Sequence, residues 1–336
     1  MTKKLLGSFL TTVLVAALAL WPRLGVPPAH GQTPPAAESA SRGVTMRDPS
    51  TIIKCKDEFW VFHTGRGVGS YHSKDLVNWE RGPRVFTNSP DWIGQAVPEN
   101  RGTYWAPDII HLGDRYLLYY SASSLGKNTS AIGLATNPTL DPNDPAWRWT
   151  DQGLVVQSRA SNDFNTIDPA IFHDADGSLW LSFGSYWSGI KLIQLDAQAG
   201  KRIAPDSPVT SLAHNSSIEA SYLYQRGGDY YLFVNWGSCL QGAKSTYNIR
   251  VGRSRKVTGP YLDKKGADLL AGGGSLFLDG REPLIGPGHA GIIIDKGTNW
   301  LSCHFEYDGG RGGATTLALL PLHWDADGWP EVDTKP

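Results

Sequence analysis

The chain has 336 residues, of which 40% are apolar, and its 31 Lys and Arg against 32 Asp and Glu leave a formal net charge of -1. This length allows one large domain or two medium ones, and the near-neutral charge gives no basis for binding nucleic acid or an anionic membrane. The chain is rich in aromatic residues, with 13 Trp, 13 Tyr and 10 Phe, which suits a β-rich core and also suits sugar binding, because an aromatic ring offers a flat apolar face.

The first segment has the layout of a secretory signal peptide. Lys3 and Lys4 precede an apolar run over 5–20, and small residues follow near position 31. The alternative is a membrane anchor, but about 16 apolar residues fall short of the roughly 20 that a span needs. We therefore predict a signal peptide over 1–31, a flexible lead-in rich in Pro, Ala and Ser over 32–42, one folded domain over 43–336, and a secreted or periplasmic location.

Five segments of this domain share one plan. Each has a polar residue, an apolar stretch, a turn at Asp or Gly, and a return through an aromatic strand, and they start at Asp48, Asp108, Asp168, Glu219 and His289. These starting residues are 60, 60, 51 and 70 residues apart, and no long stretch has a helical apolar period. Repeats of this length with four short strands are typical of propeller blades. The sequence predicts an all-β, five-bladed β-propeller; a β-sandwich followed by a second domain would not explain the regular period.

The five starting residues are expected to face one another, because the first strand of each propeller blade lines the central channel. Crowded carboxylates cannot all ionise at their usual pKa, so one holds a proton while another stays a base. Glycoside hydrolysis needs such an acid and base. A calcium-type site is the alternative use of clustered carboxylates, and a histidine in the fifth position weakens this alternative without excluding it.

The three cysteines, Cys55, Cys239 and Cys303, allow at most one disulfide. Each lies near a segment with strand character. We expect buried structural thiols rather than reactive ones.

Nine short motifs follow one another from about Val44 to the C-terminus. They are 48–50 (DPS), 73–79 (SKDLVNW), 104–108 (YWAPD), 167–170 (IDPA), 184–190 (GSYWSGI), 217–220 (SIEA), 251–254 (VGRS), 257–261 (VTGPY) and 286–291 (GPGHAG). In this order the motifs resemble those of glycoside hydrolase family 43, and within it the arabinan endo-1,5-α-L-arabinosidases.

This resemblance implies an inverting hydrolase that cleaves internal α-1,5 linkages of arabinan, a polysaccharide of the plant cell wall. It implies Asp48 as general base, Glu219 as general acid, and Asp168 as the residue that raises the pKa of the acid and orients it. His289 matches a histidine that faces a channel ion, such as calcium, or an ordered water. No organic cofactor is implied, and we expect a monomer.

The resemblance also implies residues that contact the substrate. Trp105 and Asp108 lie in the motif that lines the sugar-binding floor, with core packing as the alternative for Trp105. Trp187, Asn235 and Trp236 come just after blade strands, where rim loops contact substrate, and packing is an equal alternative for them.

Two places depart from the family pattern, and two other functions stay open. Arg47 stands where many relatives have His, and 239–242 (CLQG) replaces a stretch with two cysteines; both concern the subsites rather than the chemistry. The same fold also serves exo-acting α-L-arabinofuranosidases and β-xylosidases, and a propeller can bind carbohydrate without catalysis. The three carboxylates argue against a mere lectin, and repeat spacings of 51 to 70 residues leave no long insertion to close one end of a groove.

Overall fold

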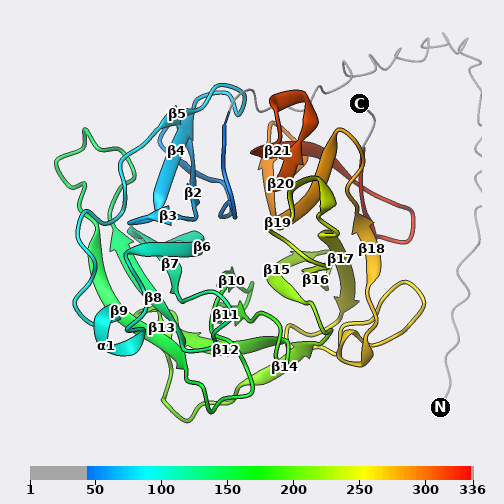
Figure 1. The fold of residues 1–336 in the computed structure, drawn as a ribbon, viewed down its shortest axis with the longest axis horizontal. Coiled ribbons are helices and arrows are strands. Elements are labelled where there is room, and N and C mark those ends of the chain that lie inside the picture. The colour runs from blue at the N-terminus through cyan, green and yellow to red at the C-terminus, as the bar shows by residue number, and fades with distance from the viewer. Residues whose placement is uncertain (1–43, 334–336) are drawn as a thin grey trace, which may run out of the picture. The chain divides into compact units, whose positions relative to one another are not determined.

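The structure is a computed structural model that describes residues 44–333. The regular structure of this part is almost entirely antiparallel β-sheet, in five sheets that follow one another around a central channel (Figure 1). The predicted five-bladed propeller is confirmed. The predicted signal peptide and lead-in lie outside the described residues.

The blades follow one another along the chain, and the first strand of each blade is the innermost. Blade I contains β1 (Ile53–Cys55), β2 (Glu58–His63), β4 (Gly69–Ser73) and β5 (Glu80–Arg81). Blade II contains β6 (Thr103–Leu112), β7 (Arg115–Ala122), β8 (Ser130–Asn137) and β9 (Thr150–Ser158), with β3 (Gly65–Arg66) beside β6. Blade III contains β10 (Ala170–His173), β11 (Leu179–Phe183), β12 (Ile190–Asp196) and β13 (Lys201–Arg202), with β14 (Thr210–Ala213) also paired to β12. Blade IV contains β15 (Glu219–Arg226), β16 (Asp229–Trp236), β17 (Asn248–Ser254) and β18 (Ser275–Leu278). Blade V contains β19 (Leu284–Asp295), β20 (Thr298–Asp308), β21 (Ala314–Trp324) and β22 (Pro330–Val332). The helical turns are α1 (Ile93–Ala96), η1 (Gly242–Lys244), η2 (Leu269–Ala271) and η3 (Gly309–Arg311).

The apolar core lies between the blades rather than at the centre of the ring. Buried side chains form five clusters among the described residues, one for each pair of neighbouring blades. At the seam of blades II and III, for example, Leu117 packs with Leu181. The neighbouring blades therefore cover both faces of a strand in the middle of a blade. The sequence of such a strand is a continuous apolar run rather than an alternation of apolar and polar residues. A single blade cannot bury its faces alone, which is why the chain needs the closed ring.

The ring closes where the first described residues join the last blade. Thr45 forms a bridge to Thr316 of β21, and Met46 donates its N–H to the Thr315 carbonyl at 3.1 Å. Val44 and Met46 belong to the apolar cluster between blades I and V. In Figure 1 the blue strands of blade I accordingly lie next to the orange and red strands of blade V.

One non-glycine residue at or before each inner strand has a left-handed backbone. These five residues are Asp48 (φ 53°), Ala106 (φ 39°), Asp168 (φ 57°), Ala220 (φ 52°) and His289 (φ 55°). Non-glycine residues in this conformation are strained, and they persist only where the surroundings hold them. The same unusual geometry in all five blades marks the positions that are equivalent in the ring.

The expected register of the repeats was right for three of the five blades and wrong for two. Asp108 follows the equivalent residue Ala106 by two positions, and Glu219 precedes the equivalent residue Ala220 by one. A register shift interrupts the strand pairing at each of these places. The same shift occurs at His289 of blade V, so the bulge is common to these three inner strands. The polar residue that marks the repeat stands at a different place relative to the bulge in each of them.

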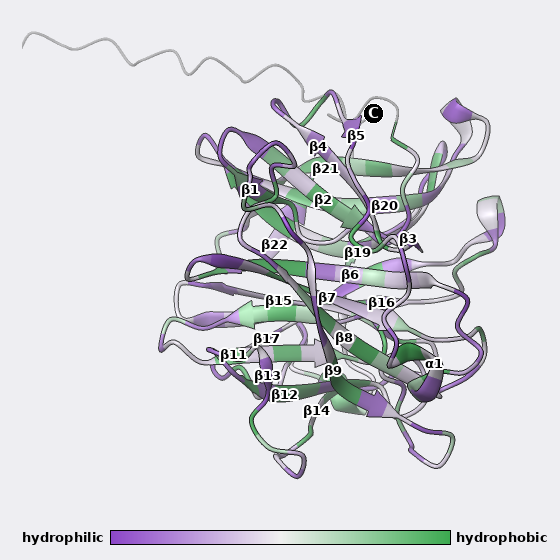
Figure 2. Ribbon diagram, turned by 90° about the vertical axis from the view of Figure 1, so that its left-hand side faces the viewer, coloured by the Kyte–Doolittle hydropathy of each residue, from purple (hydrophilic) through white to green (hydrophobic). Residues whose placement is uncertain are grey.

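The hydropathy of the described residues follows this architecture. Apolar residues run along the strands, and hydrophilic residues gather in the connecting loops (Figure 2). No helix within residues 44–333 is long and apolar enough to cross a membrane.

Candidate active site

Asp48 lies on blade I, and its carboxylate faces basic and hydroxyl groups. Its Oδ1 lies 3.3 Å from His289 Nε2 and 3.8 Å from His304 Nδ1, both of blade V. The Thr64 hydroxyl donates to its Oδ2 at 2.6 Å. Burial acts to raise the pKa of Asp48, but the His289 imidazole, the Arg47 guanidinium and the Thr64 hydroxyl together hold that pKa below its usual range. Asp48 is therefore kept as a carboxylate.

His304 is a fully buried neighbour of Asp48 that sequence reasoning missed. Its Nδ1 accepts the backbone N–H of Asp48 at 3.2 Å. Burial lowers the pKa of His304 to about 3, so the ring is neutral and carries its proton on Nε2. His304 therefore accepts a hydrogen bond from the backbone of Asp48 and does not act as a cation.

Glu219 lies on blade IV among hydroxyl groups and a thiol. The Ser185 hydroxyl donates to its Oε2 at 2.7 Å, and the Tyr247 hydroxyl donates to its Oε1 at 2.9 Å. Burial, followed by the charges of Glu219 and Glu306, raises the pKa of the nearby Cys239 thiol, which therefore stays protonated. The hydrogen-bonding partners of Glu219 are thus neutral hydroxyls, in contrast to the basic surroundings of Asp48.

The cysteines are all free, and they differ in burial. Cys55 and Cys303 are buried, as expected. The expectation of a buried thiol was wrong for Cys239, which is half-exposed because it lies in the loop beside Glu219.

Asp168 of blade III contacts the strand that carries Glu219. Its Oδ2 accepts the backbone N–H of Ala220 at 3.2 Å, and its own N–H donates to the Ser121 hydroxyl at 3.0 Å. Burial, then the charge of Glu219, then that of Asp48, raise the pKa of Asp168 well above its usual value. The raised pKa favours the protonated form of the Asp168 carboxyl.

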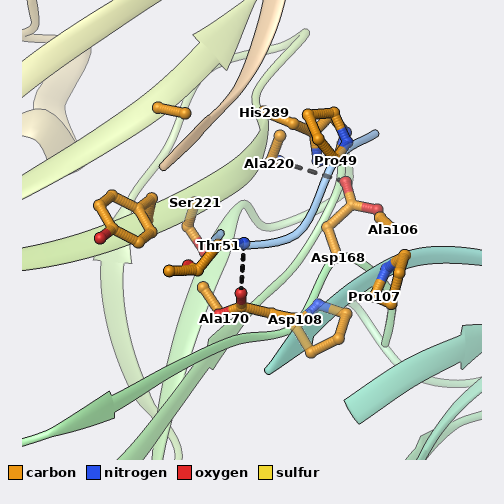
Figure 3. A pocket seen from close by; sticks show the side chains of 13 residues that line it. Pro49, Thr51, Ala106, Pro107, Asp108, Asp168, Ala170, Ala220, Ser221 and His289 are labelled. Atoms are coloured by element: carbon orange, nitrogen blue, oxygen red, sulfur yellow. Dashed lines mark hydrogen bonds between the residues drawn. The ribbon is translucent and has the colours of Figure 1, made fainter. Parts of the chain in front are cut away.

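A small cavity occupies the channel beneath these groups (Figure 3). Its volume of about 20 Å³ accommodates one water molecule and excludes a sugar ring. Asp168, His289 and Asp108 are among the residues that line it.

Asp108 is a link between blades rather than part of a sugar-binding floor. Its Oδ1 accepts the N–H of Thr51 and its Oδ2 accepts the N–H of Ile171, both at 2.9 Å (Figure 3 shows the first bond). Both oxygens are thus committed to the inner strands of blades I and III. Burial raises the pKa of Asp108 to about 6, although these hydrogen bonds act against the rise.

The other residues expected to contact substrate have unequal access to it. Trp187 is 41% exposed, and its left-handed backbone (φ 37°) presents it on the loop that also carries Ser185. Trp105 is half-buried, directly before Ala106. Trp187 is consequently the best placed of them for a sugar contact.

One of the expected contact residues, Asn235, is structural instead. It is fully buried, and its amide binds the backbone of Asn248, Pro287 and His289. Trp236, the last residue of β16, is half-buried and packs under the Arg250 guanidinium at 4.7 Å.

A buried carboxylate that the sequence did not reveal joins the two sides of the site. Glu306 Oε1 accepts from Arg47 Nη1 at 2.8 Å and from the backbone N–H of Leu240 at 2.7 Å. It thereby connects the residue before the base to the loop beside the acid. Thr64 directly follows β2 and His304 lies within β20, so a comparison of the second strands of the repeats would have pointed to these two hydrogen-bond acceptors.

The channel residues do not build a protein cage for a metal ion. Calcium takes about 6–8 oxygen ligands, whereas the oxygens of Asp108 are bound to backbone N–H groups and His289 Nε2 faces Asp48. Within residues 44–333 no group of three or more His, Cys, Asp or Glu side chains is placed to hold a metal. We therefore derive no chemical step through an ion.

Comparison with known proteins agrees with this arrangement. Residues 44–330 match the family described as glycosyl hydrolases family 43. A protein of Cellvibrio japonicus described as an extracellular exo-α-(1→5)-L-arabinofuranosidase is 41% identical over 308 residues, which are 88% of this chain and 88% of that one. A Bacillus subtilis protein described as extracellular endo-α-(1→5)-L-arabinanase 1 is 40% identical over 305 residues, covering 88% of this chain and 90% of the other. The solved structure of Cellvibrio cellulosa α-L-arabinanase complexed with arabinohexaose has a TM-score of 0.82 at 40% identity and covers 86% of this chain and 96% of that chain. The chain therefore belongs to glycosyl hydrolase family 43.

Proposed function

We propose that this protein hydrolyses internal α-1,5-L-arabinofuranosyl linkages of arabinan with inversion at the anomeric carbon. The observation that carries the proposal is the meeting of three carboxyl groups, Asp48, Asp168 and Glu219, in unlike surroundings above one channel. The names of the family members at about 40% identity support arabinan as the substrate.

Asp48 is the general base in this proposal. It stays ionised because His289 and Arg47 keep its pKa low, and the hydrogen bond from Thr64 fixes the direction of its Oδ2. The carboxylate accepts a proton from a water molecule as that water attacks the anomeric carbon. Its other oxygen stays against His289.

Glu219 is the general acid, and Asp168 keeps the proton available to it. Asp168 lines the channel cavity, whereas Glu219 is held by Ser185 and Tyr247 from the rim loops and so lies nearer the mouth. Because two adjacent carboxyls resist joint ionisation, the pair retains one proton. Glu219 delivers it to the leaving glycosidic oxygen.

Inversion follows if a water molecule fits between the base and the sugar. The carboxyl groups of inverting glycosidases lie roughly 6.5–9.5 Å apart, whereas those of retaining enzymes lie about 5 Å apart. Proton NMR of the first-formed product tests this step. We expect the β-anomer from the α-linked substrate, and an α-anomer as the first product would contradict it.

The internal mode of cleavage is supported by repeat spacings of 51 to 70 residues, which leave no long insertion to close one end of a groove. The family includes proteins named for both endo and exo action, so the test must separate the two. On linear arabinan we expect oligosaccharides early and a steep loss of viscosity for each bond cleaved. Release of arabinose alone from the first minutes would establish an exo enzyme, and Glu219→Gln serves as the inactive control.

Secretion and a monomeric state belong to the same proposal. The related proteins are named extracellular, and the N-terminal sequence has the layout of a signal peptide. Mass analysis of the protein recovered from culture medium tests both, by the position of its N-terminus and by its mass in solution.

A further inference from the structure

The backbone N–H of each of the five left-handed residues donates to a side chain. The five bonds are Asp48 to His304 Nδ1 at 3.2 Å, Ala106 to Thr64 Oγ1 at 2.8 Å, Asp168 to Ser121 Oγ at 3.0 Å, Ala220 to Asp168 Oδ2 at 3.2 Å, and His289 to Asn235 Oδ1 at 3.1 Å. We call these five donors and their five acceptors the cap ring.

The cap ring runs once around the channel in one direction. The acceptor always comes from the blade that precedes the donor in the ring. Thr64, directly after β2 of blade I, accepts the N–H of Ala106 in blade II. Ser121 of blade II accepts the N–H of Asp168, directly before the inner strand of blade III. The bond from Asp48 to His304 closes the ring between blades I and V. Each strained backbone is therefore held by its neighbour.

Four of the acceptors occupy one equivalent position. Each lies on or just after a second strand, opposite the residue that precedes the left-handed one; Ser121 pairs with Trp105, Asn235 with Glu219, and His304 with Gly288. Thr64 likewise donates its N–H to the Arg47 carbonyl. The rule therefore holds in blades I, II, IV and V.

Blade III breaks the rule, because a glycine stands at this position. Gly184 donates its N–H to Ile167, the residue before Asp168, but it has no side chain to offer. A Cβ on Gly184 would lie 2.4 Å from the Gly189 carbonyl oxygen, and its φ of 135° suits only glycine. The N–H of Ala220 is consequently left for the Asp168 carboxyl.

This exception places Asp168 beside the acid. Ala220 directly follows Glu219, so the bond from Ala220 N–H to Asp168 Oδ2 ties one carboxyl to the backbone that carries the other. Two of the other cap bonds hold the backbones of Asp48 and Asp168 themselves, and the last two hold Ala106 and His289.

We propose that the cap ring positions the catalytic carboxyl groups, with Ser121 and His304 as positioning residues for Asp168 and Asp48. The proposal rests on the catalytic roles proposed above. Ser121 and His304 are fully buried, and each acts by holding a backbone N–H. A displacement of about 1 Å at a reacting group can cost about a hundredfold in rate.

The first test compares two serine-to-alanine variants. Ser121→Ala removes the acceptor of the Asp168 N–H, and Ser158→Ala removes the acceptor of the Thr166 N–H at 2.9 Å, which lies outside the cap ring. Both serines are fully buried, and Ser158 also donates to the Asn128 carbonyl at 2.7 Å, so Ser158→Ala should lose at least as much thermal stability as Ser121→Ala. We expect kcat on linear arabinan to fall at least about tenfold with little change in KM for Ser121→Ala, and to stay within about twofold for Ser158→Ala.

A second pair of variants, at His304, tests the role of the cap ring if Ser121→Ala does not fold. In His304→Asn the amide Oδ1 is attached to Cγ, as Nδ1 is in histidine, and can accept the Asp48 N–H. In His304→Leu no acceptor remains. We expect His304→Leu to lose at least about tenfold in kcat and His304→Asn to recover part of that loss.

Equal kcat values for the two serine variants, or for the two His304 variants, would overturn the proposal. Such a result would leave the proposed function intact, since that function is tested by Asp48→Asn and Glu219→Gln. A crystal structure of Ser121→Ala gives a readout that does not depend on activity. The cap ring predicts an Asp168 carboxyl turned away from the Ala220 N–H, and an unmoved carboxyl contradicts it.

Discussion

The two sides of the active site lie on different blades and present opposite electrostatic surroundings. Asp48 is the left-handed residue of blade I, whereas Glu219 directly precedes the left-handed residue of blade IV. On the base side Asp48 faces His289 and lies next to Arg47, and its pKa is held low. On the acid side Glu219 faces hydroxyl groups, and the neighbouring Asp168 has a raised pKa because of burial and the charge of Glu219. The repeat thus supplies the positions, while the residues around them decide which carboxyl ionises.

The largest effect should come from removing either carboxyl. Asp48→Asn and Glu219→Gln should each slow hydrolysis of linear arabinan by about 10²–10⁴-fold, since acid and base catalysis each contribute that much. Steady-state rates are the measurement, and circular dichroism checks that the fold is retained. Near-wild-type turnover in a folded variant would remove that residue from its role.

The pH dependence of kcat/KM should report the base side and the acid side of the active site in one experiment. The pKa of Asp48 is lowered from 3.8 and that of Asp168 is raised well above 3.8, so kcat/KM should form a bell whose acid limb reports the base and whose basic limb reports the proton shared with Glu219. Each limb should fall about tenfold per pH unit.

The variant Thr64→Val tests which limb belongs to the base. It removes a hydrogen bond that lowers the pKa of Asp48, so the acid limb should move to higher pH while the basic limb stays in place. Movement of the basic limb alone would assign the limbs the other way round.

A smaller effect is expected from the imidazole on the base side. His289→Ala removes the group 3.3 Å from Asp48 Oδ1, and we expect about a tenfold loss of kcat/KM because the carboxylate loses its partner. Exhaustive chelation of the native enzyme separates an imidazole effect from that of a channel ion. Unchanged activity and thermal stability in both experiments would show that His289 has no functional role.

The smallest effect concerns Asp108, a channel carboxyl that belongs to neither side. Its pKa of about 6 in the folded state lies above the ordinary value of 3.8, so its contribution to stability is present below pH 3.8 and is lost as the pH rises through 6. The difference corresponds to at most about 3 kcal/mol in the free energy of unfolding.

Urea unfolding of Asp108→Asn over this pH range measures that contribution. The stability of the variant relative to wild type should rise from pH 3.8 to above pH 6 by up to about 3 kcal/mol. The exposed Asp91→Asn is the control, and its difference from wild type should stay constant. A constant difference for Asp108→Asn would show that this carboxyl does not titrate in that range.

The repeat was predictable from sequence because each blade contributes the same polar start and aromatic return. Asp48, Asp168 and His289 lie where the spacing indicated. The places of Asp108 and Glu219 were not predictable, since a bulge leaves no mark in a single sequence and the polar residue stands at a different place relative to the bulge in each blade.

The partners of the catalytic groups were hidden for another reason. Ser121, Tyr247 and His304 come from strands and loops that only the closed ring brings to the channel. A buried serine or histidine within an aromatic strand also looks like ordinary core. Asn235 shows the reverse error, because a position after a strand suggested the rim, while the fold buries it as a backbone acceptor.

The most direct test of the contrast between the two sides compares two leaving groups. A 2,4-dinitrophenyl α-1,5-arabinobioside needs no protonation to depart, whereas arabinan does. Glu219→Gln should hydrolyse the aryl glycoside at close to the wild-type rate and arabinan about 10²–10⁴-fold more slowly, while Asp48→Asn should be slow on both. Equal losses on both substrates for Glu219→Gln, or selective recovery of Asp48→Asn on the aryl glycoside, would contradict the assignment of acid and base.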